Sequence, residues 1–360
     1  MKTFKLRTPN GERTIGAKNS CFIVAEVSAN HQQKFDNAVK IIKSAAAAGA
    51  DAIKLQTYTP DTITIDSRKE WFIVGREDSP ETWKSKSLYE LYQKAYTPWE
   101  WHEDLKKIAE DLGMVLFSTP FDETAVDFLQ ERNVPCYKIA AYEATDLILL
   151  KKVAQTGKPI IMSIGFATLD EIELSVKTLR EKGAKDIALL HCTTSYSDTP
   201  KPEHTNLRTM HDLQTRFDVV TGLSDNIGGI EVPILAHAMG ASIIEKHVVV
   251  EHDEKILDDR FSLDHNELKS MVEKIRWQER IMGNALYGTQ TPQEEYYKKF
   301  RRSLFVVKDM KKGEQFTKKN IRSIRPAVGL ETKYYEDVIG KTAKNDIERG
   351  TPLSWDLMNK

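Results

Sequence analysis

The chain has 360 residues, 40% hydrophobic and 29% charged, with 52 Lys and Arg against 53 Asp and Glu. This balance leaves no broad basic field and argues against nucleic acid or an anionic membrane as the main partner. The chain starts with a polar segment and contains no apolar run long enough to span a membrane. We interpret its three cysteines, Cys21, Cys136 and Cys192, as free core thiols. These features predict a cytoplasmic protein.

Short β-branched runs alternate with amphipathic stretches over most of the chain. The runs predict strands at 22–27, 52–56, 115–119, 136–139, 159–163, 187–191, 219–224 and 243–247. Helical patterns cover 36–48, 99–112, 122–131, 168–182, 204–216 and 264–282. Such alternation is typical of parallel strands with helical crossovers, and this number of units predicts a closed (β/α)8 TIM barrel in an α/β protein. No dinucleotide-binding or P-loop signature follows a strand, which weakens a nucleotide-binding alternative.

Two segments depart from this alternation. The connection 57–98 is long and aromatic, and we interpret it either as a cover over a substrate or as a locally packed mini-core. From about residue 300 the pattern changes to short strands, and an Asp–apolar–x–x–Gly motif starts at both Asp309 and Asp346. This repeat predicts a small pseudo-symmetric β-rich domain built from two related hairpins. The expected division is therefore a barrel at 1–285, a linker at 286–299 and a β-rich domain at 300–360.

Polar residues gather where the predicted strands end, and barrel enzymes carry their reacting groups at those ends. Lys54 and Lys138 lie inside apolar strands, where a lysine is costly unless it is paired with an anion. Together with nearby hydroxyl groups they suit a small anion that carries carboxylate and phosphate groups. Pairing with an internal carboxylate, Glu26 or Glu245, is an alternative that is compatible with the first.

The last predicted strand ends in Glu245, Lys246 and His247. Glu245 and His247 share one face because strand side chains alternate. His247 has three possible roles: metal ligand, general acid, or hydrogen-bonded core histidine. Lys246 points to the opposite face, where we expect it to pack or pair behind the barrel.

Seven ordered strings resemble the sialic acid synthase family: IVAEVSANH, ADAIKLQTYTPDTITIDS, FSTPFD, YKIA, GLSD, GASIIEKH and FSLD. The likeness spans residues 20–360. Its tail resembles the antifreeze-like (SAF) domain that those synthases share with type III antifreeze proteins. Within the family, the ANH string and the long insert after LQTYTPDTITIDS most resemble pseudaminic acid synthases.

The resemblance implies that phosphoenolpyruvate is held by Lys54, Lys138, Ser163 and Ser224. Its C3 carbon attacks the aldehyde of an amino sugar, water adds at C2, and phosphate leaves with C–O cleavage. The substrate-binding set also includes four residues that would contact the sugar or its neighbourhood: Gln56, Thr194, Tyr196 and Arg325. Arg325 would reach the partner's barrel, which requires a homodimer with exchanged C-terminal domains.

The resemblance also implies a divalent ion, Mn2+, Mg2+ or Co2+, that polarises the aldehyde oxygen. His247 matches one ligand, and Asn226 stands where the family has a second histidine. This replacement favours weaker binding or a harder ion. Glu26 and Asp258, with Glu143, would orient water or bind sugar hydroxyls. His247 therefore belongs to both the catalytic and the metal-binding sets.

Other functions remain open on the sequence. N-acetylneuraminate or legionaminate synthases use the same chemistry on a different sugar. A Schiff-base aldolase would use Lys138 as its nucleophile. The antifreeze-like tail and Asn226 also allow a non-catalytic binding protein.

Overall fold

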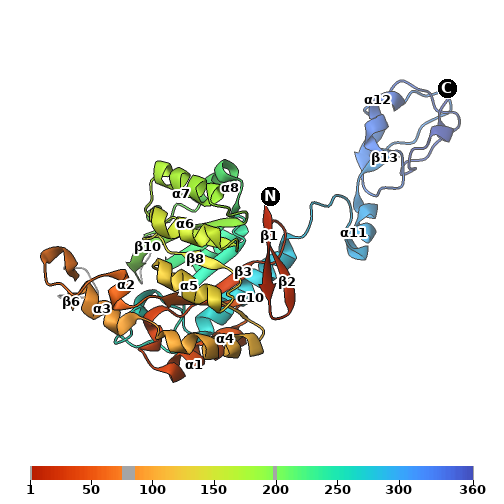
Figure 1. Ribbon diagram of the computed structural model, residues 1–360. Coiled ribbons are helices and arrows are strands. Elements are labelled where there is room, and N and C mark those ends of the chain that lie inside the picture. Colours follow the sequence, from red (N-terminus) through yellow and green to blue (C-terminus); the bar gives the residue numbers. More distant parts are fainter. Residues whose placement is uncertain (1, 75–85, 198–200, 360) are drawn as a thin grey trace. The chain divides into compact units, whose positions relative to one another are not determined.

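The computed structural model describes residues 2–74, 86–197 and 201–359, and for 195–197 it describes the backbone alone. The chain forms two compact units, Met1–Met282 and Gly283–Lys360 (Figure 1). Within the described ranges, none of the helices combines the length and apolar character that crossing a membrane requires. The two units are described separately below.

The first unit is a closed barrel of parallel strands in the order β10-β11-β12-β3-β4-β7-β8-β9. Each strand overlaps a predicted run, so the TIM-barrel prediction is confirmed. Two strands run well past their predicted ends: β11 continues to Ile227, and β10 continues to Ser197, well past the end of its neighbour β9. The strands are β3 (Phe22–Glu26), β4 (Ala52–Thr57), β7 (Val115–Pro120), β8 (Tyr137–Ile139), β9 (Ile160–Ser163), β10 (Ile187–Ser197), β11 (Val220–Ile227) and β12 (Ile243–His247).

A helix follows each barrel strand along the chain and packs on the outside of the barrel (Figure 1). Side-chain caps fix several helix starts; Asp122, for example, accepts from the backbone N–H of Thr124 and Ala125 at α5. Neither α6 nor α9 was predicted, because runs of consecutive apolar residues in these short segments obscure the helical period. The helices are α1 (Phe35–Ala48), α4 (His102–Asp111), α5 (Glu123–Glu131), α6 (Leu147–Gln155), α7 (Leu169–Glu181), α8 (Thr209–Phe217), α9 (Glu231–Ala238) and α10 (His265–Met282).

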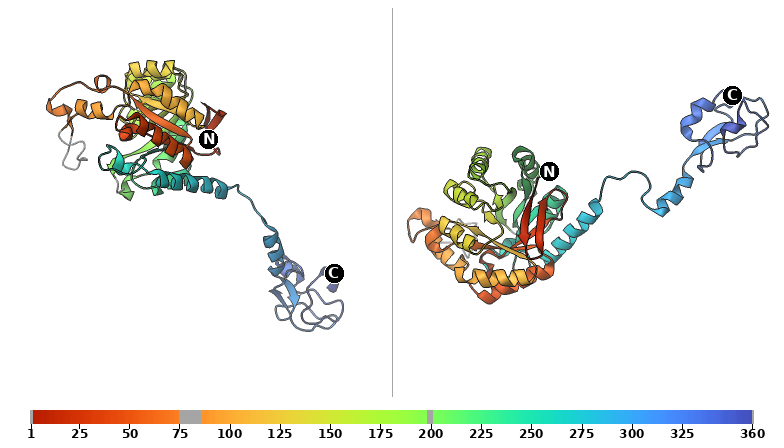
Figure 2. Two further views of the ribbon diagram at one scale, coloured as in Figure 1. Left: turned by 90° about the horizontal axis from the view of Figure 1, so that it is seen from below. Right: turned by 45° about the vertical axis from the view of Figure 1, so that its right-hand side comes forward.

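An N-terminal hairpin, which the sequence analysis did not predict, packs at the amino-terminal end of the barrel (Figure 2). It consists of β1 (Thr3–Thr8) and β2 (Gly11–Gly16), paired antiparallel. Phe4, Leu6 and Ile15 are buried and join the cluster inside the barrel with strand residues such as Phe22 and Leu190. The apolar core thus fills this end of the barrel, and the polar groups collect at the opposite end.

The long connection after β4 contains α2 (Pro60–Ile63), a two-stranded ribbon of β5 (Ile73–Val74) and β6 (Lys86–Ser87), and α3 (Leu88–Ala95). Tyr58 is buried, and its ring contacts those of Tyr92 and Phe121 edge to face at 5.4 and 5.1 Å. These contacts support the mini-core interpretation. Residues 75–85 of the insert lie outside the described ranges.

The second unit contains α11 (Pro292–Tyr297), the antiparallel pair β13 (Ser303–Val306) and β14 (Ile321–Ile324), and α12 (Tyr335–Val338). The two repeated motifs meet at Met310 and Ile347, which exchange backbone hydrogen bonds of 2.8 and 2.9 Å. Asp309 accepts from the backbone N–H of Arg349, and Asp346 accepts from that of Lys312. Each aspartate thus binds the equivalent position of the other repeat, which gives the pseudo-symmetry that the sequence predicts.

Candidate active site

Lys54 and Lys138 both lie at the carboxyl-terminal half of the barrel, where Glu245 contacts each of them. Glu245 Oε1 lies 3.6 Å from Lys54 Nζ and 3.8 Å from Lys138 Nζ. Ser224 Oγ donates to the same oxygen at 2.9 Å. All four residues are buried. The two cations therefore share one internal carboxylate, as the alternative interpretation of the lysines allows.

Lys54 has a second carboxylate partner in Glu26, the last residue of β3, and also donates to Thr119 Oγ1 at 3.3 Å. Burial lowers the pKa of Lys54, but attraction to Glu245 and Glu26 outweighs this effect and raises the pKa overall. Burial also raises the pKa of Glu26 to about 7, although Lys54 opposes this shift. Glu26 is thus a carboxyl group that exchanges its proton near neutral pH.

Among the described residues, Lys138 has no carboxylate as close as Glu26 is to Lys54. Its ammonium donates to Ser163 Oγ at 2.7 Å and to the Ile139 carbonyl at 2.8 Å. Burial lowers the pKa of Lys138, and Glu245 only partly offsets this effect. An additional anion beside Lys138 would therefore stabilise its charged form.

His247, Asp258 and Gln56 extend the site on the other side of Glu26. His247 Nδ1 lies 3.8 Å from Asp258 Oδ2 and has no hydrogen-bond partner in the described part of the chain. Burial, together with Lys54, holds the pKa of His247 well below its usual value, so the imidazole is neutral. Asp258 accepts from Ser28 Oγ at 2.5 Å, and Gln56 donates to the same hydroxyl at 3.0 Å. Sequence reasoning omitted Ser28 from the site residues, although it follows Glu26 within the same motif.

A divalent ion fits beside His247. The imidazole is neutral and its buried Nδ1 lacks a partner, as a metal ligand requires. The side-chain nitrogen of Asn226 donates to Cys192 Sγ at 3.5 Å, so its amide oxygen is the group left for a cation. A nitrogen and oxygen donor set of this kind suits borderline and hard divalent ions.

A different cluster, His252, Asp264 and Glu267, also has ligand atoms close enough to hold an ion. Its groups already bind each other at the start of α10. Glu267 Oε2 lies 3.2 Å from His252 Nε2 and accepts from the backbone N–H of Asp264. His252 Nδ1 lies 2.9 Å from Asp259 Oδ1. These contacts account for the cluster without an ion, so it does not compete with His247 as the candidate site.

The remaining predicted residues occupy different places. Glu143 follows β8, and its buried Oε2 has no hydrogen-bond partner among the described residues. Thr194 is partly buried on β10. Tyr196 is on the same strand, but its side chain lies outside the described part. Arg325 follows β14 in the second unit. Its predicted approach to a partner's barrel remains a proposal.

Lys246 behaves as predicted for a residue on the outer face. It is fully buried, forms an ion pair with Asp225 at 2.8 Å and also donates to the Ile227 carbonyl. Asp225 accepts a further bond from Thr193 Oγ1 at 2.7 Å. This network links β10, β11 and β12 and fixes the strands that carry Asn226 and His247.

Changing Glu143 to Gln is expected to weaken the pH dependence of stability. Burial raises the pKa of Glu143 to about 7 from an ordinary 4.5, although Lys138 opposes this shift. The folded state therefore binds a proton that the unfolded chain releases. The resulting stabilisation is complete below the unfolded pKa and is lost as pH rises through the folded one. Glu143 should make the free energy of unfolding fall by about 2 kcal/mol between about pH 5 and about pH 8.

Urea unfolding of the barrel at both pH values measures this difference in the Gln variant. Glu103→Gln, at an exposed position on α4, is the matched control and should retain the full pH dependence. If the free energy of unfolding changes equally with pH in the parent protein and in Glu143→Gln, the raised pKa of Glu143 is contradicted.

The chain is similar to two known protein families and to several characterised proteins. A NeuB family profile matches residues 41–287 and a SAF domain profile matches residues 301–357. The pseudaminic acid synthase of Helicobacter pylori is 42% identical over 334 residues, covering 93% of this chain and 96% of that protein. The N,N'-diacetyllegionaminic acid synthase of Campylobacter jejuni is 35% identical, covering 89% and 95%. The crystal structure of an N-acetylneuraminic acid synthetase from Leptospira borgpetersenii, in complex with citrate, has a TM-score of 0.69 at 30% identity, covering 82% and 95%.

Proposed function

Because the chain belongs to the NeuB family of sialic acid synthases, we propose that it is a pseudaminic acid synthase. It would condense phosphoenolpyruvate with 2,4-diacetamido-2,4,6-trideoxy-L-altrose to give pseudaminate and phosphate. The observation that carries the proposal is the pair of buried lysines that share Glu245 at the carboxyl ends of the barrel strands. Two cations with nearby hydroxyls suit a donor that carries both a carboxylate and a phosphate.

The lysines and serines would hold phosphoenolpyruvate in one orientation. Lys138 with Ser163 forms one anion-binding corner, and Lys54 with Thr119 forms the other. Ser224, which donates to Glu245, can turn its hydroxyl toward the incoming anion. Interactions with both anionic groups of the donor would orient the molecule and so position its C3 carbon for reaction.

The condensation balances as follows. The C3 carbon of phosphoenolpyruvate forms a bond to the aldehyde carbon, and the aldehyde oxygen gains a proton. Water then adds to the electron-poor C2 and loses one proton. Phosphate leaves with C–O cleavage while the hydroxyl left at C2 gives up its remaining proton and becomes the keto oxygen. We assign the proton of this water to Glu26, since its pKa near 7 allows proton exchange at neutral pH. Asp258, held by Ser28, would bind sugar hydroxyls or the water.

A divalent ion held by His247 and Asn226 would supply Lewis-acid polarisation of the aldehyde oxygen. Asn226→His should then raise the affinity for Mn2+ by about tenfold, because imidazole is a better ligand than an amide for a borderline ion. Electron paramagnetic resonance of unbound Mn2+ measures this without turnover. Mg2+ affinity should not rise. An unchanged Mn2+ affinity would remove position 226 from the ligand set.

The decisive assay measures phosphate release from phosphoenolpyruvate with a panel of sugars and each divalent ion in turn. We expect turnover with the diacetamido sugar to exceed that with the sugars of legionaminate and N-acetylneuraminate synthases. Preference for either of these sugars would replace the proposed substrate while retaining the chemistry. A label in the bridging oxygen of phosphoenolpyruvate tests which bond breaks. If the C–O bond is cleaved, the label should appear in the released phosphate and not in the sugar acid.

A Schiff-base aldolase is favoured by one observation, the lowered pKa of Lys138, which makes its amine a better nucleophile. Borohydride trapping with pyruvate separates the two mechanisms. A covalent adduct on Lys138 would support the aldolase, and its absence alongside phosphate release would support the synthase.

We further propose a homodimer that exchanges its C-terminal domains, so that Arg325 of one subunit serves the site of the other. The family membership and the separate SAF unit support this proposal. The barrel, linker and SAF domain would occupy 1–285, 286–299 and 300–360. The reaction would take place in the cytoplasm, which the three buried free cysteines favour.

A further inference from the structure

Ser28 has a backbone conformation that serine rarely adopts. It lies two residues after the end of β3, has a φ of 45°, and is only 3% exposed. A positive φ brings the Cβ atom too close to the backbone, a cost that glycine avoids because it has no Cβ. Buried residues that keep such a strained conformation gather at functional sites, because the surrounding structure must stabilise them.

The Ser28 hydroxyl joins two predicted site residues that are distant in the sequence. Its Oγ donates to Asp258 Oδ2 at 2.5 Å and accepts from Gln56 Nε2 at 3.0 Å. The hydroxyl has a single hydrogen and the carboxylate can only accept, so these two bonds fix the direction of that hydrogen. The Gln56 amide is fixed as well, because its nitrogen faces Ser28. Its oxygen is then the acceptor that the amide can offer to a ligand.

The backbone of Ser28 supports a third site residue, Glu26. The Ser28 N–H donates to Glu26 Oε1 at 3.0 Å. Glu26 lies on the inner face of β3 with Val24, which belongs to the apolar cluster inside the barrel. Gln56 lies on the inner face of β4, because the preceding residue, Leu55, packs in the cluster between the strands and the helices. Both strand residues that Ser28 contacts therefore face the interior of the barrel.

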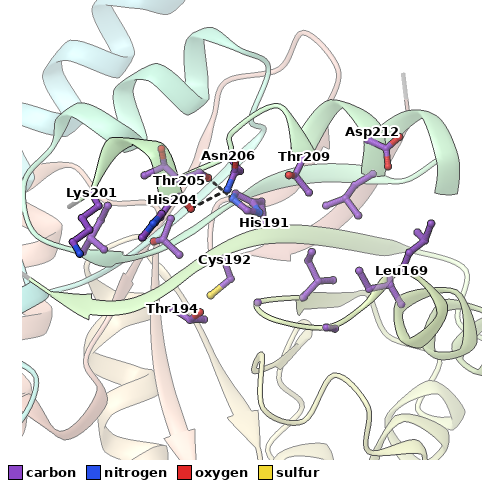
Figure 3. A pocket seen from close by; sticks show the side chains of 17 residues that line it. Leu169, His191, Cys192, Thr194, Lys201, His204, Thr205, Asn206, Thr209 and Asp212 are labelled. Atoms are coloured by element: carbon purple, nitrogen blue, oxygen red, sulfur yellow. Dashed lines mark hydrogen bonds between the residues drawn. The ribbon is translucent and has the colours of Figure 1, made fainter. Parts of the chain in front are cut away.

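Strained backbone is not a general requirement for supporting a side chain at this end of the barrel. Cys192 lines a cavity of about 780 Å3 beside β10, where it extends from the face of the strand opposite to His191 (Figure 3). Its Sγ accepts from the side chain of Asn226, and it does so from within a strand. The positive φ of Ser28 is therefore not explained by its place beside the reaction centre alone.

We propose that Ser28 is a positioning residue, whose hydroxyl holds Asp258 and Gln56 in the orientation needed for the sugar or the attacking water. This inference rests on the proposed function, which assigns these ligands to the two residues. The strained backbone allows Ser28 to bind Asp258 with its side chain and Glu26 with its N–H at once. Among the described residues, neither Lys54 nor Lys138 is a hydrogen-bond partner of the hydroxyl. Its loss should therefore affect the sugar more than phosphoenolpyruvate.

Two substitutions separate the hydroxyl from the backbone strain. Ser28→Ala removes the hydroxyl and keeps a Cβ atom at positive φ, whereas Ser28→Gly removes both. Each keeps the backbone N–H that binds Glu26. Ala17→Gly is the matched control, because Ala17 has a φ of 51° in the turn that follows β2, outside the site. Urea unfolding and steady-state kinetics are measured for all three variants, with phosphoenolpyruvate and the sugar that the parent protein prefers.

We expect both Ser28 variants to lower kcat/KM for the sugar by about 100-fold, with KM for phosphoenolpyruvate unchanged. Their stabilities should differ, because glycine relieves the strain: Ser28→Gly should unfold at a higher urea concentration than Ser28→Ala. Ala17→Gly should raise the urea midpoint of the parent protein for the same reason and leave both KM values unchanged. An equal loss of activity at unequal stability separates positioning from a purely structural role, in which activity would follow stability.

The two proposals fail in different ways. If Ser28→Gly keeps the kcat/KM of the parent protein for the sugar, the positioning role is overturned and the proposed function stands. An equal rise of KM for both substrates would also overturn it, since the hydroxyl would then support the whole site. A urea midpoint of Ser28→Gly at or below that of Ser28→Ala would overturn the strain. If the parent protein releases phosphate with no sugar of the panel, the proposed function fails and takes this inference with it.

Discussion

Replacing Lys54 with Met is expected to lower kcat/KM for phosphoenolpyruvate by at least about 1000-fold. Lys54 is the cation that contacts both Glu26 and Glu245, and its removal leaves two carboxylates facing the donor's negative charges. The same change should lower the free energy of unfolding by about 3 to 5 kcal/mol, because a buried ion pair loses one partner. Steady-state kinetics and urea unfolding measure the two effects separately.

A double variant distinguishes loss of binding from loss of stability. In Lys54→Met with Glu26→Gln, one of the unpaired charges is removed, so much of the stability should return while activity stays low. Lys152→Met is the surface control. Lys152 pairs with Asp127 at 2.6 Å in a partly exposed position, so its loss should cost less than about 1 kcal/mol and leave kinetics unchanged. An unaltered KM for phosphoenolpyruvate in Lys54→Met would remove this lysine from the anion site.

The barrel and the place of its site could be predicted because both depend on local patterns. Parallel strands that are covered on both sides consist of apolar runs, and β3, β7 and β12 are buried at every position. A charged residue inside such a run is conspicuous, so the sequence alone identifies Lys54 and Lys138 as candidate site residues. Their meeting on Glu245 follows from barrel closure, since every strand then presents its carboxyl end at the same rim.

Other features depend on contacts that the sequence does not reveal. The N-terminal hairpin has alternating residues, with Phe4 and Leu6 buried between exposed neighbours, but six-residue strands with many charges are weak signals. β10 pairs with β9 only as far as Leu190 and Ser163 and then continues to Ser197. No sequence pattern marks this difference in strand length.

Arg325→Ala is expected to lower kcat/KM for the sugar by at least about 100-fold while both units remain folded. A guanidinium that holds an acylamino carbonyl would contribute a charge-assisted hydrogen bond, and alanine removes it. This loss alone does not show which subunit the arginine serves. Mixing experiments can, because an exchanged domain places Arg325 and Lys54 of one site on different chains.

Equal amounts of Arg325→Ala and Lys54→Met subunits, each inactive alone, are unfolded together and refolded. If the domains are exchanged, each mixed dimer contains one site with an intact Lys54 and an intact Arg325, and activity should return to about a quarter of the parent value. If Arg325 serves the barrel of its own chain, every site in the mixed dimer carries one defect and no activity returns. Because both variants are full-length chains with a single change, restored turnover can arise only from residues contributed across the dimer.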